Sequence, residues 1–290
     1  MLRDTIEWES HYSQTLKIEG ISNVDLNQRT PYIDNLLKYS KGIKNSLEFG
    51  SGKGGLSLLL KMKRPKIHTT LLDYSPGAIK FSKLRYKHYH KTGKFICGSF
   101  LNMPFKNETF DFVHGNTSFE HVSNSLKAAE ELVRVTKKGG YILITVPNAH
   151  RKYTGHDLYH YINRLQYFSR TFYFSELEKL FEDNNCEVVD RFGVTLIFFA
   201  PTYIPRLLYE LFLDVRRKLF SKKASNRLNK NTSTEDIVNY KRIYTTWLYP
   251  FYLIDRLWLY LQDKINYFFD YILKLHPSAY VTIGIVFRKK

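Results

Sequence analysis

The sequence predicts an α/β protein built on a Rossmann-like, doubly wound sheet that is mostly parallel and carries a helical insertion. Between residues 41 and 200, short apolar runs alternate with segments of helical character, and turn residues separate them. This alternation is typical of βαβ units, whose right-handed crossovers place helices on both faces of a parallel sheet. The alternation stops after Ala200 and a strand-like run returns at the end, which predicts an insertion within the sheet domain.

The individual elements are expected in a regular order. Strands are expected at 45–51, 66–75, 94–100, 109–116 and 140–148, and helices at 54–63, 75–91, 123–137 and 175–185, with a β-rich run at 186–200. Ser75-Pro76 is a helix-start signal, and the Gly139-Gly140 pair is expected to stop the helix before it. The second strand is expected to end at Asp73.

Three regions follow from this order. Residues 1–40 form an N-terminal helical segment, 41–200 with 279–290 form the sheet domain, and 201–278 form a helical, aromatic and basic insertion. The strand at 279–290 makes the third region an excursion from the sheet and not a tail.

The net charge and the cysteine content indicate the kind of protein, but they do not identify its partner. The formal charge of +17 favours an anionic partner such as nucleic acid, acidic lipid or a phosphorylated substrate. The two cysteines, Cys97 and Cys186, lie in apolar runs and are expected to be reduced core residues of a cytoplasmic protein. The N-terminus is not expected to be a signal peptide, and no apolar run is long enough for a spanning helix.

The stretch LEFGSGKGG, Leu47–Gly55, fits three nucleotide-loop patterns. An ATP loop needs four residues before Gly-Lys and a Ser or Thr after it, and the Gly that follows Lys53 breaks that pattern. A dinucleotide loop fits Gly50-x-Gly52-x-x-Gly55 with an acid about 20 residues further on. The third pattern, Glu48-x-Gly50-x-Gly52-x-Gly54, suits S-adenosylmethionine, whose ammonium side an acidic residue before the loop can face.

Candidate ligand residues also follow the next three strands. Asp73, Ser99–Leu101 and Asn116 stand at the expected carboxyl ends of the second, third and fourth strands. Ligands of doubly wound sheets bind outside these ends. The convergence indicates one nucleotide site along a single edge of the sheet.

Several segments together resemble class I S-adenosylmethionine-dependent methyltransferases of the type 11 group. LEFGSGKGG is similar to the first motif of the family, LLDYSPGAI to the second, and GSFLNMPFKNETFDFVHGNTSFEHV to its adenine segment and fourth strand. ELVRVTKKGGYILITVPN is similar to its next helix end and fifth strand. The resemblance covers residues 40 to 200 and implies an antiparallel last strand at YVTIGIVF.

The resemblance implies S-adenosylmethionine as cofactor, with Asp73 on the ribose hydroxyls and Tyr74 over the adenine. The predicted cofactor-binding residues are Glu48, Gly50, Ser51, Gly52, Gly54, Asp73, Tyr74, Ser99, Phe100, Leu101 and Asn116. Ser99 departs from the family, which usually has an acid there, so adenine binding would depend more on the backbone of Phe100 and Leu101.

Histidines after the fourth and fifth strands are candidates for the chemistry. His121 is the candidate catalytic base, because imidazole titrates near neutrality, and its alternative role is to start or cap the next helix. His150, His156 and His160 stand among basic and aromatic residues that suit a substrate wall or a solvated face. No metal site is expected, because the spacing of His156 and His160 lacks the Glu of a zinc-helix motif.

The insertion carries a long apolar stripe at helical spacing. Its members are Trp247, Phe251, Ile254, Trp258, Leu261, Ile265, Phe268, Ile272 and Leu275. The stripe would cover the sheet domain, form a homodimer interface or dock on an anionic membrane surface. Residues 201–290 hold 16 Lys and Arg against 7 Asp and Glu, which is +9, and this charge is the argument for a membrane.

Three functions remain open from the sequence. The first is an enzyme that methylates a small-molecule or lipid-like acceptor by direct displacement. The second is a nucleic-acid methyltransferase, although the Asn/Asp-Pro-Pro-aromatic sequence of amino-methylating enzymes is absent after Asn116. The third is a non-catalytic module that binds S-adenosylmethionine.

Overall fold

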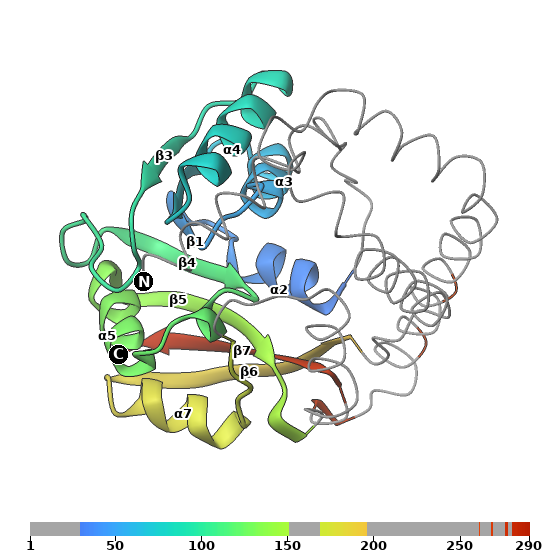
Figure 1. Cartoon of the computed structure of the whole chain (residues 1–290), viewed down its shortest axis with the longest axis vertical. Coiled ribbons are helices and arrows are strands. Elements are labelled where there is room, and N and C mark those ends of the chain that lie inside the picture. Colours follow the sequence, from blue (N-terminus) through green and yellow to red (C-terminus); the bar gives the residue numbers. More distant parts are fainter. Residues whose placement is uncertain (1–29, 151–168, 196–260, 262–267, 269–275, 278–279) are drawn as a thin grey trace, which may run out of the picture.

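A computed structural model describes residues 30–150, 169–195, 261, 268, 276–277 and 280–290 (Figure 1). Residues 1–29 and nearly all of the predicted insertion lie outside these ranges, so the proposed domain boundaries stay a prediction. No helix of the described part is long and apolar enough to cross a membrane.

The centre of the fold is a seven-stranded sheet in the order β3-β2-β1-β4-β5-β7-β6 (Figure 1). The strands are β1 (Asn45–Phe49), β2 (His68–Asp73), β3 (Lys94–Cys97), β4 (Phe110–Asn116), β5 (Thr136–Pro147), β6 (Cys186–Thr195) and β7 (Thr282–Lys289). β1 to β5 run parallel, whereas β7 is antiparallel to both of its neighbours. The predicted fold class and the antiparallel last strand are therefore confirmed.

Helices cover both faces of this sheet. They are α2 (Pro31–Tyr39), α3 (Gly55–Lys63), α4 (Pro76–His88), α5 (Ser125–Val135) and α7 (Phe174–Glu182), with a short 3₁₀ turn η1 at Phe119–His121. Along β4, Phe112 packs with the core of α2 and α3, and the next residue, Val113, packs with the core of α5 and α7. The alternation of strand side chains thus divides the core between the two faces.

Local signals start the helices where the sequence predicts. The Ser75 hydroxyl accepts a hydrogen bond of 3.2 Å from the amide of Ala78, and Pro76 is the first residue of α4. The Asn124 side chain caps α5 by accepting from the amide of Lys127 at 2.9 Å. Such caps satisfy amide groups that have no partner inside the helix.

Two predictions on local structure are wrong. Gly139-Gly140 does not stop the preceding helix: α5 ends at Val135, and β5 begins at Thr136, whose hydroxyl donates to the carbonyl of Leu132 at 2.7 Å. The glycines instead lie in a bulge, because the β4–β5 register jumps from Phe110↔Thr136 to Phe112↔Tyr141. Gly139 adopts a left-handed backbone conformation in this bulge, with a φ of +73°.

Cys97 is also not a core residue. It ends β3, the outermost strand on its side of the sheet, and is exposed, whereas Cys186 is buried as predicted. An edge strand is covered less completely than a central one. Neither cysteine forms a disulfide, and the Cys97 thiol donates to the carbonyl of Tyr74 at 3.6 Å.

The ring of Phe49 on β1 packs closely against the backbone of Gly115 on β4, next to the loop that follows β1. A Cβ on Gly115 would lie 2.3 Å from the ring of Phe49. We expect Gly115→Ala to lower the free energy of unfolding by ~1–3 kcal/mol, the usual cost of overpacking a core. Urea denaturation measures this. Gly98→Ala is the control, since its Cβ would lie 3.5 Å from Leu72, and equal losses in both variants would contradict the argument.

Candidate functional site

The loop after β1 is shaped by three glycines in left-handed backbone conformations. Gly50, Gly52 and Gly54 have φ values of +58°, +50° and +65°. A side chain at Gly50 would also collide with Ser118, whose Cβ lies 2.5 Å from the Cβ position. Backbone conformation therefore favours glycine at all three positions, and lack of space requires it at Gly50 and also at Gly54, where a Cβ would lie 2.7 Å from Leu71.

Side chains from two other segments hold this loop. Ser118 donates its hydroxyl to the carbonyl of Gly50 at 3.0 Å, and Ser82 of α4 donates to the carbonyl of Gly52 at 2.9 Å. Arg85, also on α4, donates to the carbonyl of Lys53 at 3.0 Å. The loop is thus fixed before any ligand binds, which lowers the entropy cost of binding.

Asp73, at the end of β2, ties the loop to the neighbouring strand. One carboxylate oxygen accepts from the amide of Gly52 at 2.7 Å, and the other accepts from the amide of Ser75 at 2.9 Å. Burial raises the pKa of Asp73, and these amides oppose the increase. The carboxylate keeps lone pairs for a ribose, but its contact with a ribose stays a prediction.

Glu48 lies beneath the loop. Its side chain is buried, and it accepts a hydrogen bond from the amide of Ser57 in the first turn of α3 at 2.9 Å. Burial raises the pKa of Glu48 to about 7. The contact that the structure shows joins the loop to its helix, and the predicted role toward an ammonium group is not tested by it.

The loop also holds a hydroxyl that suits a polar ligand. The Ser51 hydroxyl is buried and has no hydrogen-bond partner among the described residues. The amide of Ser51 donates to the carbonyl of Leu72 at 3.1 Å. Because orphaned buried hydroxyls are uncommon, this group is a candidate donor to the carboxylate of an amino-acid ligand.

The predicted adenine side of the site follows β2 and β3. Tyr74 is exposed, so its ring is free to cover a base. The Ser99 hydroxyl accepts from the amide of Leu101 at 3.1 Å, and the ring of Phe100 packs 5.2 Å from that of Phe49. Ser99 thus stabilises its own turn. An adenine that accepted a hydrogen bond from the Leu101 amide would have to displace the Ser99 hydroxyl.

Asn116 ends β4 at the same edge of the sheet. It is exposed, and its amide oxygen accepts from the hydroxyl of Thr145 at 2.6 Å. The following residue, Thr117, has a φ of +48°, a strained value for a side chain with a branched β-carbon. This turn directs the chain towards Ser118 and the glycine loop.

His121 and Glu120 form the turn that follows. The Nε2 atom of His121 lies 3.8 Å from a carboxyl oxygen of Glu120 in η1. Sequence reasoning missed Glu120, which is 2% exposed, and whose second oxygen has no partner among described residues. Burial raises its pKa to about 8, so this carboxyl is mostly protonated at neutral pH. The signal that the sequence offered for this residue was a glutamate between Phe119 and His121, just after the fourth strand.

A second buried ionisable residue was also missed. His114, in the middle of β4, is fully buried, and its Nδ1 lies 3.2 Å from the hydroxyl of Tyr32 on α2. Burial lowers the pKa of His114 to about 3, so the ring is neutral. It is paired with Glu48 across the β1–β4 register, directly below the loop.

Only one of the three later histidines lies in a described range. His150 is exposed, and its ring meets Tyr173 edge-on at 4.8 Å. His156 and His160 lie outside the described residues. Within the described residues no cluster of three potential metal ligands occurs.

Comparison with known proteins agrees with this geometry. Residues 47–144 match a family described as methyltransferase domain. That segment contains the glycine loop, Asp73, the turn at Ser99 and the end of β4. The chain therefore contains a class I S-adenosylmethionine-dependent methyltransferase domain.

The relatives that match name different acceptors. A demethylmenaquinone methyltransferase of Thermotoga maritima is 31% identical over 111 residues, which cover 38% of this chain and 47% of the relative. A norajmaline N-methyltransferase of Rauvolfia serpentina is 32% identical over 114 residues, 39% of this chain and 38% of the relative. The chain thus spans less than half of the length of these curated relatives.

A solved structure confirms the fold over a wider range. A putative sarcosine dimethylglycine methyltransferase from Galdieria sulphuraria superposes with a TM-score of 0.55 at 16% identity, covering 97% of this chain and 98% of that one. Identity at this level supports the fold alone.

The buried carboxyl of Glu120 predicts a measurable dependence of stability on pH. Its pKa is about 8 in the folded protein against an ordinary value of 4.5, so the folded state holds more protons between these values. The free energy of unfolding should therefore fall as the pH rises from 4.5 to 8.

We expect Glu120→Gln to reduce that slope and to leave the part that Glu48 contributes, because an amide has the same shape as the carboxyl and does not ionise. Thermal or urea unfolding of both proteins across this pH range measures it. The exposed Glu130→Gln is the control. A slope that Glu120→Gln leaves unchanged would show that Glu120 ionises normally.

Proposed function

We propose that this chain transfers a methyl group from S-adenosylmethionine directly to a small-molecule or lipid-like acceptor. The observation that carries the proposal is the pre-shaped glycine loop, tied by Asp73 to the end of β2 at the edge where the strand ends converge. The matching domain family and the methyltransferase relatives support the same donor.

The residues at this edge fit the parts of the donor. We assign the ribose to Asp73, the adenine to Tyr74 with Ser99–Leu101, and the amino-acid carboxylate to the Ser51 hydroxyl and the glycine loop. Glu48, Gly54 and Asn116 then shape the loop and its neighbouring turn. When bound, the cofactor supplies a methyl group already activated by a sulfonium.

The chain's own contribution to the chemistry is alignment and exclusion of water. An acceptor that carries a proton on its nucleophilic atom also needs a base. His121 is the proposed base, at the end of β4. The neighbouring carboxyl of Glu120, protonated at neutral pH, would hold a proton beside it without adding a charge.

The acceptor is proposed to contact the insertion. β6 ends at Thr195, which is paired with Thr282 at the start of β7, and Thr282 is also paired with Pro147 at the end of β5. The chain therefore leaves and re-enters the sheet at the edge that carries the glycine loop. Residues 196–281 start and end at the same edge of the sheet as the glycine loop, which supports a role for them in acceptor binding.

Asp73 provides the test of the donor site. We expect Asp73→Ala to weaken S-adenosylmethionine binding by about a hundredfold or more, since it removes a charged acceptor that also fixes the Gly52 amide. Isothermal titration calorimetry measures the affinity. Asp190→Ala is the control, because Asp190 is paired with Lys38 at the protein surface. Unchanged affinity in Asp73→Ala would remove Asp73 from the site.

A lipid-like acceptor is tested through the basic part of the insertion. We expect vesicles that contain phosphatidylglycerol to co-sediment the full chain, and the triple variant Arg216→Glu, Arg217→Glu, Lys218→Glu to lose most of this binding. A matched triple variant on α4, Lys80→Glu, Lys83→Glu, Lys87→Glu, makes the same charge change on exposed positions. Equal binding by both variants would count against docking through the insertion and favour a soluble acceptor.

A further inference from the structure

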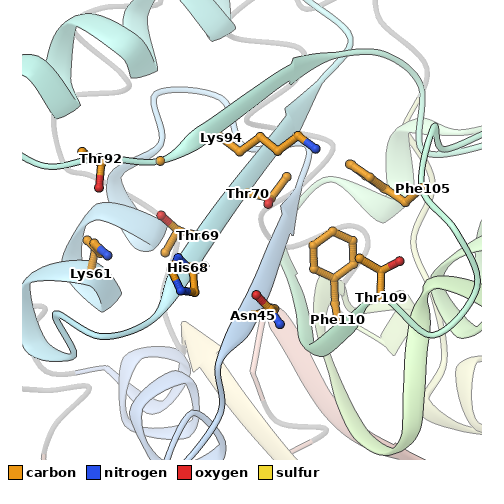
Figure 2. A pocket seen from close by; sticks show the side chains of 11 residues that line it. Asn45, Lys61, His68, Thr69, Thr70, Thr92, Lys94, Phe105, Thr109 and Phe110 are labelled. Carbon is orange, nitrogen blue, oxygen red and sulfur yellow. The ribbon is translucent and has the colours of Figure 1, made fainter.

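A cavity of about 480 Å³ lies at the opposite end of the parallel strands from the glycine loop (Figure 2). It is bordered by the starts of four strands, at Asn45 of β1, His68 of β2, Lys94 of β3 and Phe110 of β4. The five residues of β1 separate the two ends by about 13 Å, at the usual rise per strand residue. The cavity is therefore a separate place on the molecule.

The charged side chains that line this cavity are basic, and the nearby carboxylate of Asp111 is paired with Lys137 and with the amide of Asn45. Lys61 and Lys94 line it together with His68, and its recorded lining contains no carboxylate. Lys61 already donates to the carbonyls of Pro65 and Ile67, at 2.9 and 2.6 Å. Lys94 has no hydrogen-bond partner among the described residues, so its ammonium can donate to a ligand. These basic lining side chains favour an anionic ligand.

A buried hydroxyl faces the same space. Thr70 is 7% exposed and lines the cavity; its backbone is paired with Leu47 and Lys94 in the sheet, and its hydroxyl has no hydrogen-bond partner among the described residues. The neighbouring Thr69 differs, because its hydroxyl lies 3.1 Å from that of Tyr86. Figure 2 shows Thr70 between the Lys94 side chain and Asn45.

One wall of the cavity is aromatic. Phe105 and Phe110 meet edge-on with ring centroids 5.0 Å apart, and the ammonium of Lys94 lies 5.9 Å from the Phe105 centroid. Small-ligand sites usually combine such an apolar wall with a few polar groups, in volumes of roughly 300–1,000 Å³. The site thus offers separate contacts to an anionic group and to an apolar group of one ligand.

We propose that this cavity binds a phosphorylated small molecule or headgroup. Its phosphate would contact the ammonium of Lys94 and the hydroxyl of Thr70, and its apolar part would contact Phe105 and Phe110. The site is independent of the methyl-donor site, so occupation of one should not compete with the other.

Phenyl phosphate is the probe for a soluble ligand, because it carries both a phosphate and an aromatic group. At constant ionic strength, calorimetry with the full chain should show saturable binding. We expect Lys94→Ala to weaken it about tenfold or more, since a hydrogen bond between charged groups is lost, and Thr70→Val to weaken it less. The exposed Lys179→Ala on α7 controls for net charge.

Two further measurements complete the test. The affinity of Lys94→Ala for S-adenosylmethionine should equal that of the wild type, which separates this site from the donor site. Vesicles that contain phosphatidate, compared with phosphatidylcholine alone, test a lipid headgroup: Lys94-dependent binding to these vesicles without phenyl phosphate binding would assign the phosphate to a lipid. The proposal is overturned if Lys94→Ala and Lys179→Ala bind both probes equally, or if neither probe binds the wild type saturably.

Discussion

The hydrogen bond between the Gly52 amide and the Asp73 carboxylate, 2.7 Å long, is the contact on which the candidate site depends. It joins the ends of β1 and β2, and it turns a loop of left-handed glycines into a fixed surface. Ser118 and Ser82 hold the same loop from two other segments, by its carbonyl groups. A single carboxylate thereby fixes the loop, and it is also the residue proposed to accept from the ligand.

Burial sets the electrostatics around this loop, although the whole chain is strongly basic. Glu48, Asp73 and Glu120 all have raised pKa values, and in each the largest cause is loss of water. The chain carries a net charge of +17, and among the described basic residues Lys61 and Lys94 lie around the cavity at the opposite end of the strands. Net charge therefore indicates the character of the partners better than that of the reaction site.

The sheet and the glycine loop could be predicted because their signals are local. Strand runs, the Ser75-Pro76 start and the spacing of Gly50, Gly52 and Gly54 can each be read within a few residues. The boundary at Thr136 was missed because pairing with β4 competes with helix formation, and the exposure of Cys97 because it depends on which strand lies at the edge. Glu120 and His114 were missed for a related reason. Their burial depends on segments far away in the sequence, such as Tyr32, which is 82 positions from His114.

The pairing of Thr195 with Thr282 has a consequence for how such a chain can change. In the topology of the sheet, everything between these two residues is the connection of one antiparallel hairpin. The entropy of closing a loop grows only slowly with its length, so this connection can be lengthened, shortened or exchanged at little cost to the strands. Transplanting it between relatives would test whether this connection determines acceptor preference while the donor site stays the same.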